Sequence, residues 1–211
     1  ILPEAKVERI ESRSDFDAFS SMGLIATAKE KASILEKHKD NYLVYTEDRA
    51  FPIRLPYTIP ARWAKKTPAL SFEGQAAKNE YYTWQIGLWA VKTDLKNVKL
   101  TFSDFTSGES KISKDSITCF NQGGTNWDGK PISFEVNVPK GNVQALWCGI
   151  QIPQNVKKGE YTGTATLTAE GEKPKEIKIT IHVDDIILAD KGDSETWRHS
   201  RLRWLNSTIG L

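Results

Sequence analysis

Residues 177–183 read Ile-Lys-Ile-Thr-Ile-His-Val, so a hydrophobic side chain stands at every second position. Successive side chains of a β-strand point to opposite faces, and this alternation is typical of a strand with one buried and one solvated face. Several other segments of the chain show the same alternation. Linkers rich in Gly, Pro, Lys and Asn separate these segments, and no helical pattern lies between them. The pattern predicts a mainly β protein, an antiparallel two-sheet β-sandwich of the immunoglobulin or fibronectin kind. The same period recurs at 81–91, 98–102, 132–138, 146–152 and 161–168.

The first sixty residues follow a different pattern. A short helix is predicted to start near Ser14, and a stronger helix spans Thr27–Lys39 with an apolar stripe at Ala28, Ala32 and Leu35. The run 81–91 is apolar on both faces, so it needs a cover on its second face. We therefore expect a single sandwich domain over residues 1–190. Its parts are a helical and extended N-terminal cover (1–60) and the strands (61–190). A tail (191–211) follows the domain.

Composition excludes several classes of protein. The 211 residues are 39% hydrophobic and 27% charged, as in an ordinary soluble globular protein. The net charge is +2 and no long run of Lys or Arg occurs, so no nucleic-acid partner is expected. The apolar runs are strand-sized, so no membrane span is expected. The start Ile1–Lys6 lacks a signal-peptide pattern, as in both mature secreted and cytosolic proteins.

Cysteine and histidine are too sparse to indicate a metal site. The cysteines are Cys119 and Cys148, and both lie in strand-like segments. The main interpretation is two buried free thiols, and a single bridge between strands stays open as an alternative. The histidines are His38, His182 and His199, and none has metal-ligand spacing to another histidine or to a cysteine. No metal and no other cofactor is expected.

No set of residues predicts catalysis. The sequence has no Gly-x-Ser-x-Gly elbow. The acidic pairs Asp184-Asp185 and Asp15/Asp17 have no apolar surroundings that would raise a carboxyl pKa for acid catalysis. We assign no catalytic residue to this chain.

Residues 124–130 read Gly-Thr-Asn-Trp-Asp-Gly-Lys, which matches the spacing of a phosphate-binding loop. The next residue is Pro131 instead of Ser or Thr, and a strand follows where that loop needs a helix. A hairpin or long loop with Asp128-Gly129 in its turn is therefore favoured.

The same loop suggests a second use, because it places an indole beside amide and carboxylate groups. Trp127, Asn126 and Asp128 are candidate carbohydrate-binding residues, and Trp89 is a second aromatic candidate. The alternative is structural, since most of the seven tryptophans must lie in the core.

The tail from residue 194 mixes aromatic and basic side chains and has no closing signal. We expect it to lead toward a C-terminal catalytic domain. Its candidate interdomain contacts are Trp197, Arg201, Arg203 and Trp204.

Several stretches together resemble one family. They are Tyr-Thr-Glu-Asp-Arg at 45–49 with Pro-Ile-Arg at 52–54, and the segments 79–87, 118–121, 143–149 and 197–209. They resemble the N-terminal β-sandwich region of large bacterial glycoside hydrolase-like proteins related to glycoside hydrolase family 123. The resemblance implies a secreted or periplasmic protein in which a β-sandwich precedes an (α/β) barrel.

Family 123 enzymes remove terminal N-acetylgalactosamine, using an Asp-Glu pair with the acetamido group of the substrate as nucleophile. The resemblance places that pair in the barrel, and no position of this chain matches it. The leading hypothesis is thus a non-catalytic accessory sandwich that supports the catalytic barrel of a protein acting on glycans, such as N-acetylhexosaminides. Its partners would be that barrel and glycans. The alternatives are a carbohydrate-binding module, or a protein-interaction or adhesion sandwich with no glycan role.

Overall fold

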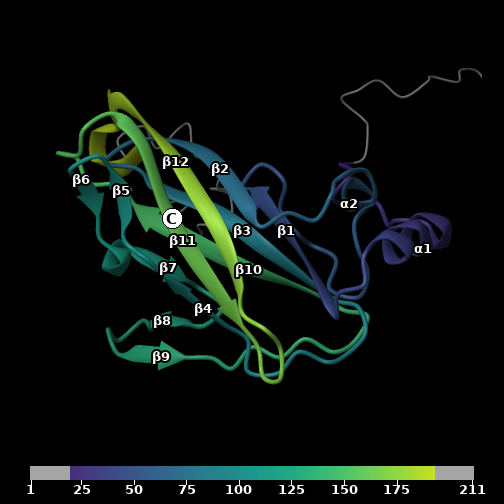
Figure 1. Cartoon of the computed structure of the whole chain (residues 1–211). Helices are drawn as coiled ribbons and strands as arrows, with labels where there is room; N and C mark the ends of the chain where they lie inside the picture. Colours follow the sequence, from purple (N-terminus) through teal and green to yellow (C-terminus); the bar gives the residue numbers. More distant parts are fainter. Residues whose placement is uncertain (1–19, 193–211) are drawn as a thin grey trace, which may run out of the picture.

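The computed structural model describes residues 20–192, in which two β-sheets stack face to face (Figure 1). The first sheet has four strands in the order β1-β3-β10-β7, and every neighbouring pair is antiparallel. The predicted mainly β sandwich is confirmed. The strands of this sheet are β1 (Tyr42–Asp48), β3 (Tyr81–Ala90), β10 (Val143–Gln151) and β7 (Ile117–Cys119).

The second sheet has the order β2-β12-β11-β5-β6, and β4 pairs with β11 as well. One pair departs from the predicted antiparallel arrangement, because β2 runs parallel to β12. The chain passes from β2 directly into β3 of the other sheet through Asn79, whose φ of 65° allows a tight turn. The strands are β2 (Ser71–Lys78), β4 (Lys99–Phe102), β5 (Phe105–Ser107), β6 (Ser110–Ile112), β11 (Gly159–Thr168) and β12 (Lys175–Ile187).

The main core lies between the two sheets. The apolar positions of the 177–183 run are buried, as their alternation predicts. They face the inner side of β3, where Trp84 is fully buried. Its ring stacks on Phe72 at 6.0 Å and meets Phe102 edge-on at 6.3 Å between ring centroids.

A second core covers the outer face of the first sheet. Its centre is Trp63 of α2 (Ala61–Lys65), whose ring stacks on Tyr45 with centroids 4.1 Å apart. Gly87 of β3 leaves room for this indole, because a Cβ there would lie 2.6 Å from the Trp63 ring. Strand β3 is thus buried on both faces. The cluster consists of Met22, Ala26, Ile34, Leu43, Tyr45, Ile53, Ile59, Trp63, Trp89 and Val143.

A buried carboxylate ties α2 to β1. The side chain of Glu47 is only 1% exposed and accepts a hydrogen bond from the indole Nε1 of Trp63 at 3.0 Å. Its other oxygen lies 3.2 Å from Nε of Arg62 and 3.1 Å from Nζ of Lys66. The sequence indicated no role for Glu47, since its partners are known only once α2 packs on the sheet.

Helix α1 (Ala28–Lys37) lies within the predicted helix Thr27–Lys39, but its apolar face differs from the predicted one. Thr27 is its N-cap and forms a capping box with Glu30, which explains where the helix starts. The predicted stripe of Ala28, Ala32 and Leu35 is wrong, because all three are exposed. The helix packs against the second core through Ile34, its one buried residue.

The run 132–138 is a strand only in its first part. Strand β9 covers Pro131–Ser133, and it pairs with β8 (Gly123–Thr125) outside both sheets. Ile132 and Phe134 are therefore exposed, while Val136 and Val138 return to the main core. Alternation alone could not show that the hairpin leaves the sandwich.

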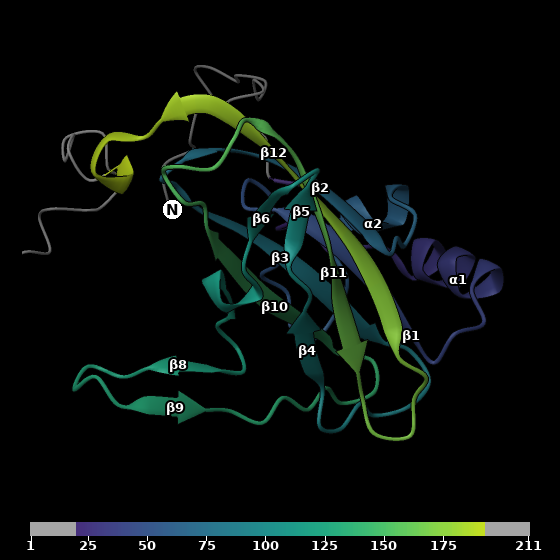
Figure 2. The same ribbon diagram turned by 60° about the vertical axis from the view of Figure 1, so that its left-hand side comes forward.

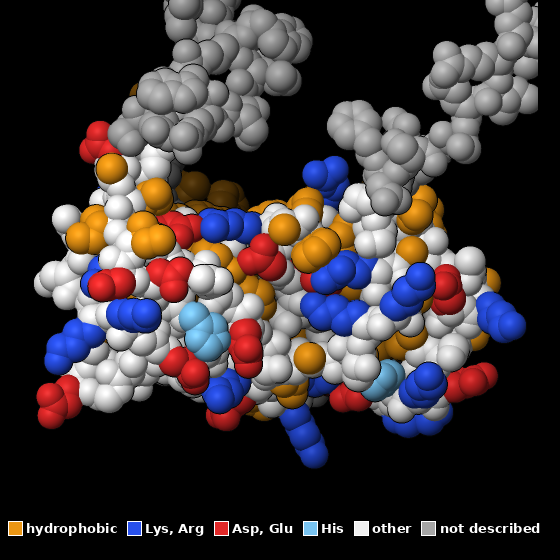
Figure 3. All heavy atoms as spheres, turned by 90° about the horizontal axis from the view of Figure 1, so that it is seen from above, with side chains coloured by type: hydrophobic (Ala, Val, Ile, Leu, Met, Phe, Trp, Pro, Cys, Tyr) orange, Lys and Arg blue, Asp and Glu red, His pale blue; other side chains and the backbone are white. Residues whose placement is uncertain are grey.

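The rest of the described part adds short helices and a mixed surface. A 3-10 helix covers Lys114–Ser116 (η2), and the turn Ala189–Gly192 (η3) has left-handed backbone at Asp190 and Lys191. Within residues 20–192, no helix is both long and apolar enough to cross a membrane. Basic and acidic side chains are mixed over the face that Figure 3 shows. The helix predicted near Ser14 lies outside the described residues.

Candidate functional site: the β8–β9 arm and its groove

The β8–β9 hairpin, residues 123–133, projects from the sandwich as an arm (Figure 2). Its tip is closed by hydrogen bonds from Asn126 N to Lys130 O at 2.9 Å and from Gly129 N to Asn126 O at 3.1 Å. Gly129 has a φ of 79°, a left-handed conformation that glycine adopts at little cost. The hairpin predicted for residues 124–130, with Asp128-Gly129 in its turn, is confirmed.

Three of the predicted carbohydrate-binding residues lie together at the tip of the arm. Trp127 is 96% exposed, which leaves both faces of its indole open. The backbone N of Lys130 donates to Oδ1 of Asn126 at 2.8 Å, and Lys130 Nζ lies 2.9 Å from the Asp128 carboxylate. This lysine also lowers the pKa of Asp128. These polar groups therefore stabilise the turn, and the indole of Trp127 remains accessible to solvent.

Trp89, the other aromatic candidate, is a wrong prediction. It is only 5% exposed and belongs to the second core, where Leu43 of β1 and Val143 of β10 lie opposite it. The outer face of β3 is covered, so Trp89 cannot provide an exposed platform.

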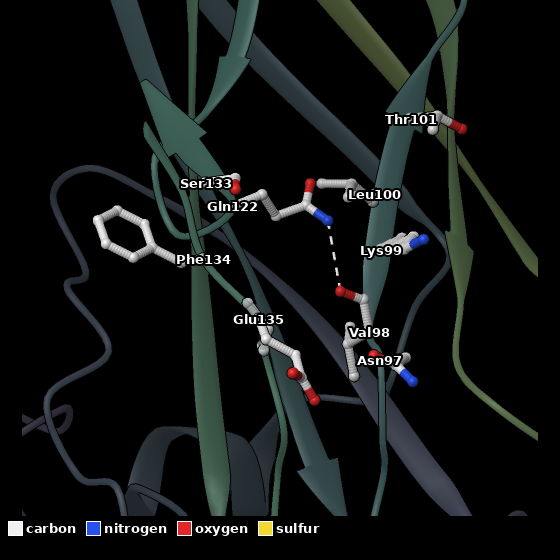
Figure 4. A pocket seen from close by; sticks show the side chains of 10 residues that line it. Asn97, Val98, Lys99, Leu100, Thr101, Gln122, Ser133, Phe134 and Glu135 are labelled. Atoms are coloured by element: carbon white, nitrogen blue, oxygen red, sulfur yellow. Dashed lines mark hydrogen bonds between the residues drawn. The ribbon is translucent and has the colours of Figure 1, made fainter. Parts of the chain in front are cut away.

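A groove of about 470 Å³ lies where the arm joins the sandwich (Figure 4). One wall is β4 with the two residues before it, and the other is Gln122 with the segment 133–136. The amide Nε2 of Gln122 donates across the groove to the carbonyl oxygen of Val98 at 3.4 Å. In the lining of the groove, Lys99 contributes a positive charge and Glu135 a negative charge. Sequence reasoning missed this groove, because Phe134 alternates like a core residue and only the structure shows that it is exposed.

The acidic pair Asp184-Asp185 does not have the surroundings of a glycosidase pair. Such a pair needs two carboxyl groups facing each other across the scissile bond, about 5–9.5 Å apart. Asp184 and Asp185 are consecutive on β12, and each side chain contacts a different residue of β2. Asp184 accepts from Gln75, and Lys78 lowers the pKa of Asp185, the reverse of what a general acid needs.

The histidines and cysteines of the described residues form no metal-binding cluster. Within residues 20–192, no three His, Cys, Asp or Glu side chains gather as metal ligands. The exposed His182 lies 3.9 Å from Glu73. Cys119 and Cys148 are free and buried, and they face each other across β7 and β10. The predicted interdomain residues Trp197, Arg201, Arg203 and Trp204 lie outside the described residues.

Comparison with known proteins gives a likeness of fold. No protein-family model matches the chain, and no curated protein matches it in sequence. A family 123 glycoside hydrolase from Clostridium perfringens, studied for the hydrolysis of glycolipid glycans, superimposes with a TM-score of 0.54 at 20% identity. The match covers 70% of this chain and 28% of that enzyme. The chain is therefore similar in fold to part of a family 123 enzyme and spans under a third of its length.

Two other matches superimpose with lower TM-scores. The PapD-like domain 7 of human CEP192 matches at a TM-score of 0.34 and 10% identity, over 56% of this chain and 82% of that one. A type I cohesin from Pseudobacteroides cellulosolvens matches at a TM-score of 0.29 and 13% identity, over 54% and 88% of the two chains.

Proposed function

We propose that this chain is a non-catalytic accessory β-sandwich of a secreted or periplasmic glycoside hydrolase-like protein. In this proposal it supports a catalytic barrel that acts on glycans, such as N-acetylhexosaminides. The observation that carries the proposal is the fold match to part of a family 123 enzyme that hydrolyses glycolipid glycans.

The interior of the sandwich supports a structural role. Both faces of β3 are filled with side chains, and the buried carboxylate of Glu47 is neutralised by Arg62 and Lys66. The side chain of Glu47 is only 1% exposed, so it offers no open path to a substrate. Its contacts serve to attach the cover to the sheet.

The natural polypeptide provides the first test. The proposal requires a catalytic domain in that polypeptide besides the sandwich, and a gene that encodes none would refute it. In the full-length protein, deletion of residues 1–190 should lower the melting temperature of the catalytic domain. An unchanged melting temperature would argue against a supporting role.

Enzyme assays on the isolated chain provide the second test. We expect no hydrolysis of aryl N-acetylhexosaminides or of glycolipid glycans. Robust turnover that survives repeated purification would overturn the non-catalytic assignment.

The exposed indole of Trp127 favours a second candidate function, a carbohydrate-binding module. An aromatic face offers apolar contact area to a sugar ring without further ordering of the chain. Glycan-array binding that is lost in Trp127→Ala would support this role. The matched control is Tyr57→Ala, which removes another aromatic side chain, 80% exposed, from the cover. Absence of binding across the array would leave the accessory role.

A further inference from the structure

Cys119 and Cys148 lie directly opposite each other on two antiparallel strands. Cys119 ends β7, the edge strand of the first sheet, and Cys148 lies in β10 next to it. The neighbouring pair is joined by a hydrogen bond from Phe120 N to Trp147 O at 2.9 Å. Hydrogen-bonded and non-hydrogen-bonded pairs alternate along an antiparallel ladder, so the cysteines form a non-hydrogen-bonded pair.

This kind of pair has the backbone spacing of a disulfide. Directly opposed residues in it have Cα atoms about 4.5 Å apart and Cβ atoms near the short end of about 4.5–5.5 Å. A disulfide accepts Cα separations of about 4.4–6.8 Å and Cβ separations of about 3.5–4.5 Å. Both side chains point into the main core, where Cys119 is 8% and Cys148 0% exposed. Little movement of the backbone is needed to join the sulfurs.

We propose that Cys119 and Cys148 form an intramolecular disulfide when the chain meets an oxidising disulfide, such as that of a thiol–disulfide oxidoreductase. The Cys119 thiolate attacks one sulfur of the partner disulfide, which gives a mixed disulfide and releases the first partner thiolate. The Cys148 thiolate then attacks the Cys119 sulfur and releases the second. Two electrons reduce the partner disulfide, and the protons of the two cysteines pass through solvent to the partner thiols.

The order of attack follows from the surroundings of the two thiols. Hydrogen bonding between them lowers the pKa of Cys119, whereas burial raises the pKa of Cys148. Cys119 also ends an edge strand of only three residues, and such a short strand at the edge of a sheet can open locally. It is therefore the first nucleophile, either during folding or when β7 opens.

The disulfide would fix the base of the β8–β9 arm to the first sheet. The chain passes from Cys119 through residues 120–122 into β8, so a bond to β10 holds the point at which the arm leaves the sheet. This consequence concerns the position of Trp127 and does not depend on what Trp127 binds. The inference therefore stands apart from the proposed function.

The state of the thiols can be measured on the wild-type chain. The protein is refolded with a mixture of reduced and oxidised glutathione, denatured without reductant, treated with an alkylating reagent and weighed by mass spectrometry. We expect no alkylated cysteine before reduction and two afterwards, in a chain that stays monomeric on a non-reducing gel. Two alkylated thiols before reduction, glutathione adducts alone, or covalent dimers would overturn the proposal.

The stability of the oxidised protein shows whether the disulfide fits the geometry of the sheet or distorts it. Oxidised wild type should unfold at a higher urea concentration than reduced wild type, and the amides of β7 should exchange more slowly. The double variant Cys119→Ala/Cys148→Ala is the control, because its urea midpoint should not respond to reductant. A wild-type midpoint that stays the same or falls on oxidation would contradict the inference.

Discussion

Removing the buried carboxylate of Glu47 should loosen the cover from the sheet. In Glu47→Ala the indole N–H of Trp63 loses its acceptor at 3.0 Å. Trp63 is fully buried, so water cannot replace that acceptor. An unsatisfied buried donor costs about 1–3 kcal/mol. This is the largest contribution to the expected loss.

The two cations contribute less. The side chains of Arg62 and Lys66 are 31% and 30% exposed, so both can turn toward water when the carboxylate is gone. Ion pairs that reach solvent are worth about 0–1 kcal/mol each. Together with the indole, these contacts predict that Glu47→Ala lowers the free energy of unfolding by about 1–5 kcal/mol.

Urea unfolding followed by circular dichroism measures this loss, with the m-value checked for constancy. Glu109→Ala in the exposed turn between β5 and β6 is the matched control and should stay within about 0.5 kcal/mol of wild type. Glu47→Gln should lose less than Glu47→Ala, because its amide oxygen can still accept from the indole. A loss below about 1 kcal/mol in Glu47→Ala would refute the reasoning, since it would mean that the indole N–H finds another partner.

Three further predictions concern the core and the surface. Trp84→Ala removes a fully buried indole and should cost about 3–5 kcal/mol by urea unfolding; a cost below about 1 kcal/mol would contradict its place between the sheets. Gly163→Ala puts a Cβ 2.0 Å from the buried ring of Phe105 and should cost about 1–3 kcal/mol, whereas an unchanged midpoint would show that the ring can move. The hydrogen bond from Lys175 at 3.0 Å lowers the pKa of Asp40, so this pair stabilises the fold above the unfolded pKa of about 3.9, and the contribution disappears as the pH falls through the folded pKa. As the pH falls from about 6 to below the unfolded pKa of about 3.9, the wild-type urea midpoint should therefore fall more than that of Asp40→Asn, and equal falls would exclude the pair.

The tip of the arm could be predicted because its signals are local. The dipeptide Asp128-Gly129 supplies a turn, and Pro131 excludes the phosphate-binding loop. The position of the arm could not be predicted. Ile132 and Phe134 alternate like core residues, and only the pairing of β9 with β8 shows that they lie outside the sandwich.

The two tryptophans proposed for sugar binding show the same limit. Trp127 lies beside polar turn residues, and that local context agrees with its exposure. Trp89 lies in a run that is apolar on both faces, and its burial depends on residues 22–63 covering the sheet. Whether an aromatic side chain meets solvent is decided by segments distant in sequence.

The sequence by itself determined the sandwich class, because an alternation such as that of residues 177–183 follows from the geometry of each strand. It also determined the start of α1, where Thr27 and Glu30 cap each other within one turn. Only the tertiary structure decided that β2 runs parallel to β12, that Glu47 meets Trp63, and that Cys119 faces Cys148. Each of these contacts joins strands or helices far apart in the chain, and the periodicity of a single segment says nothing of its neighbour.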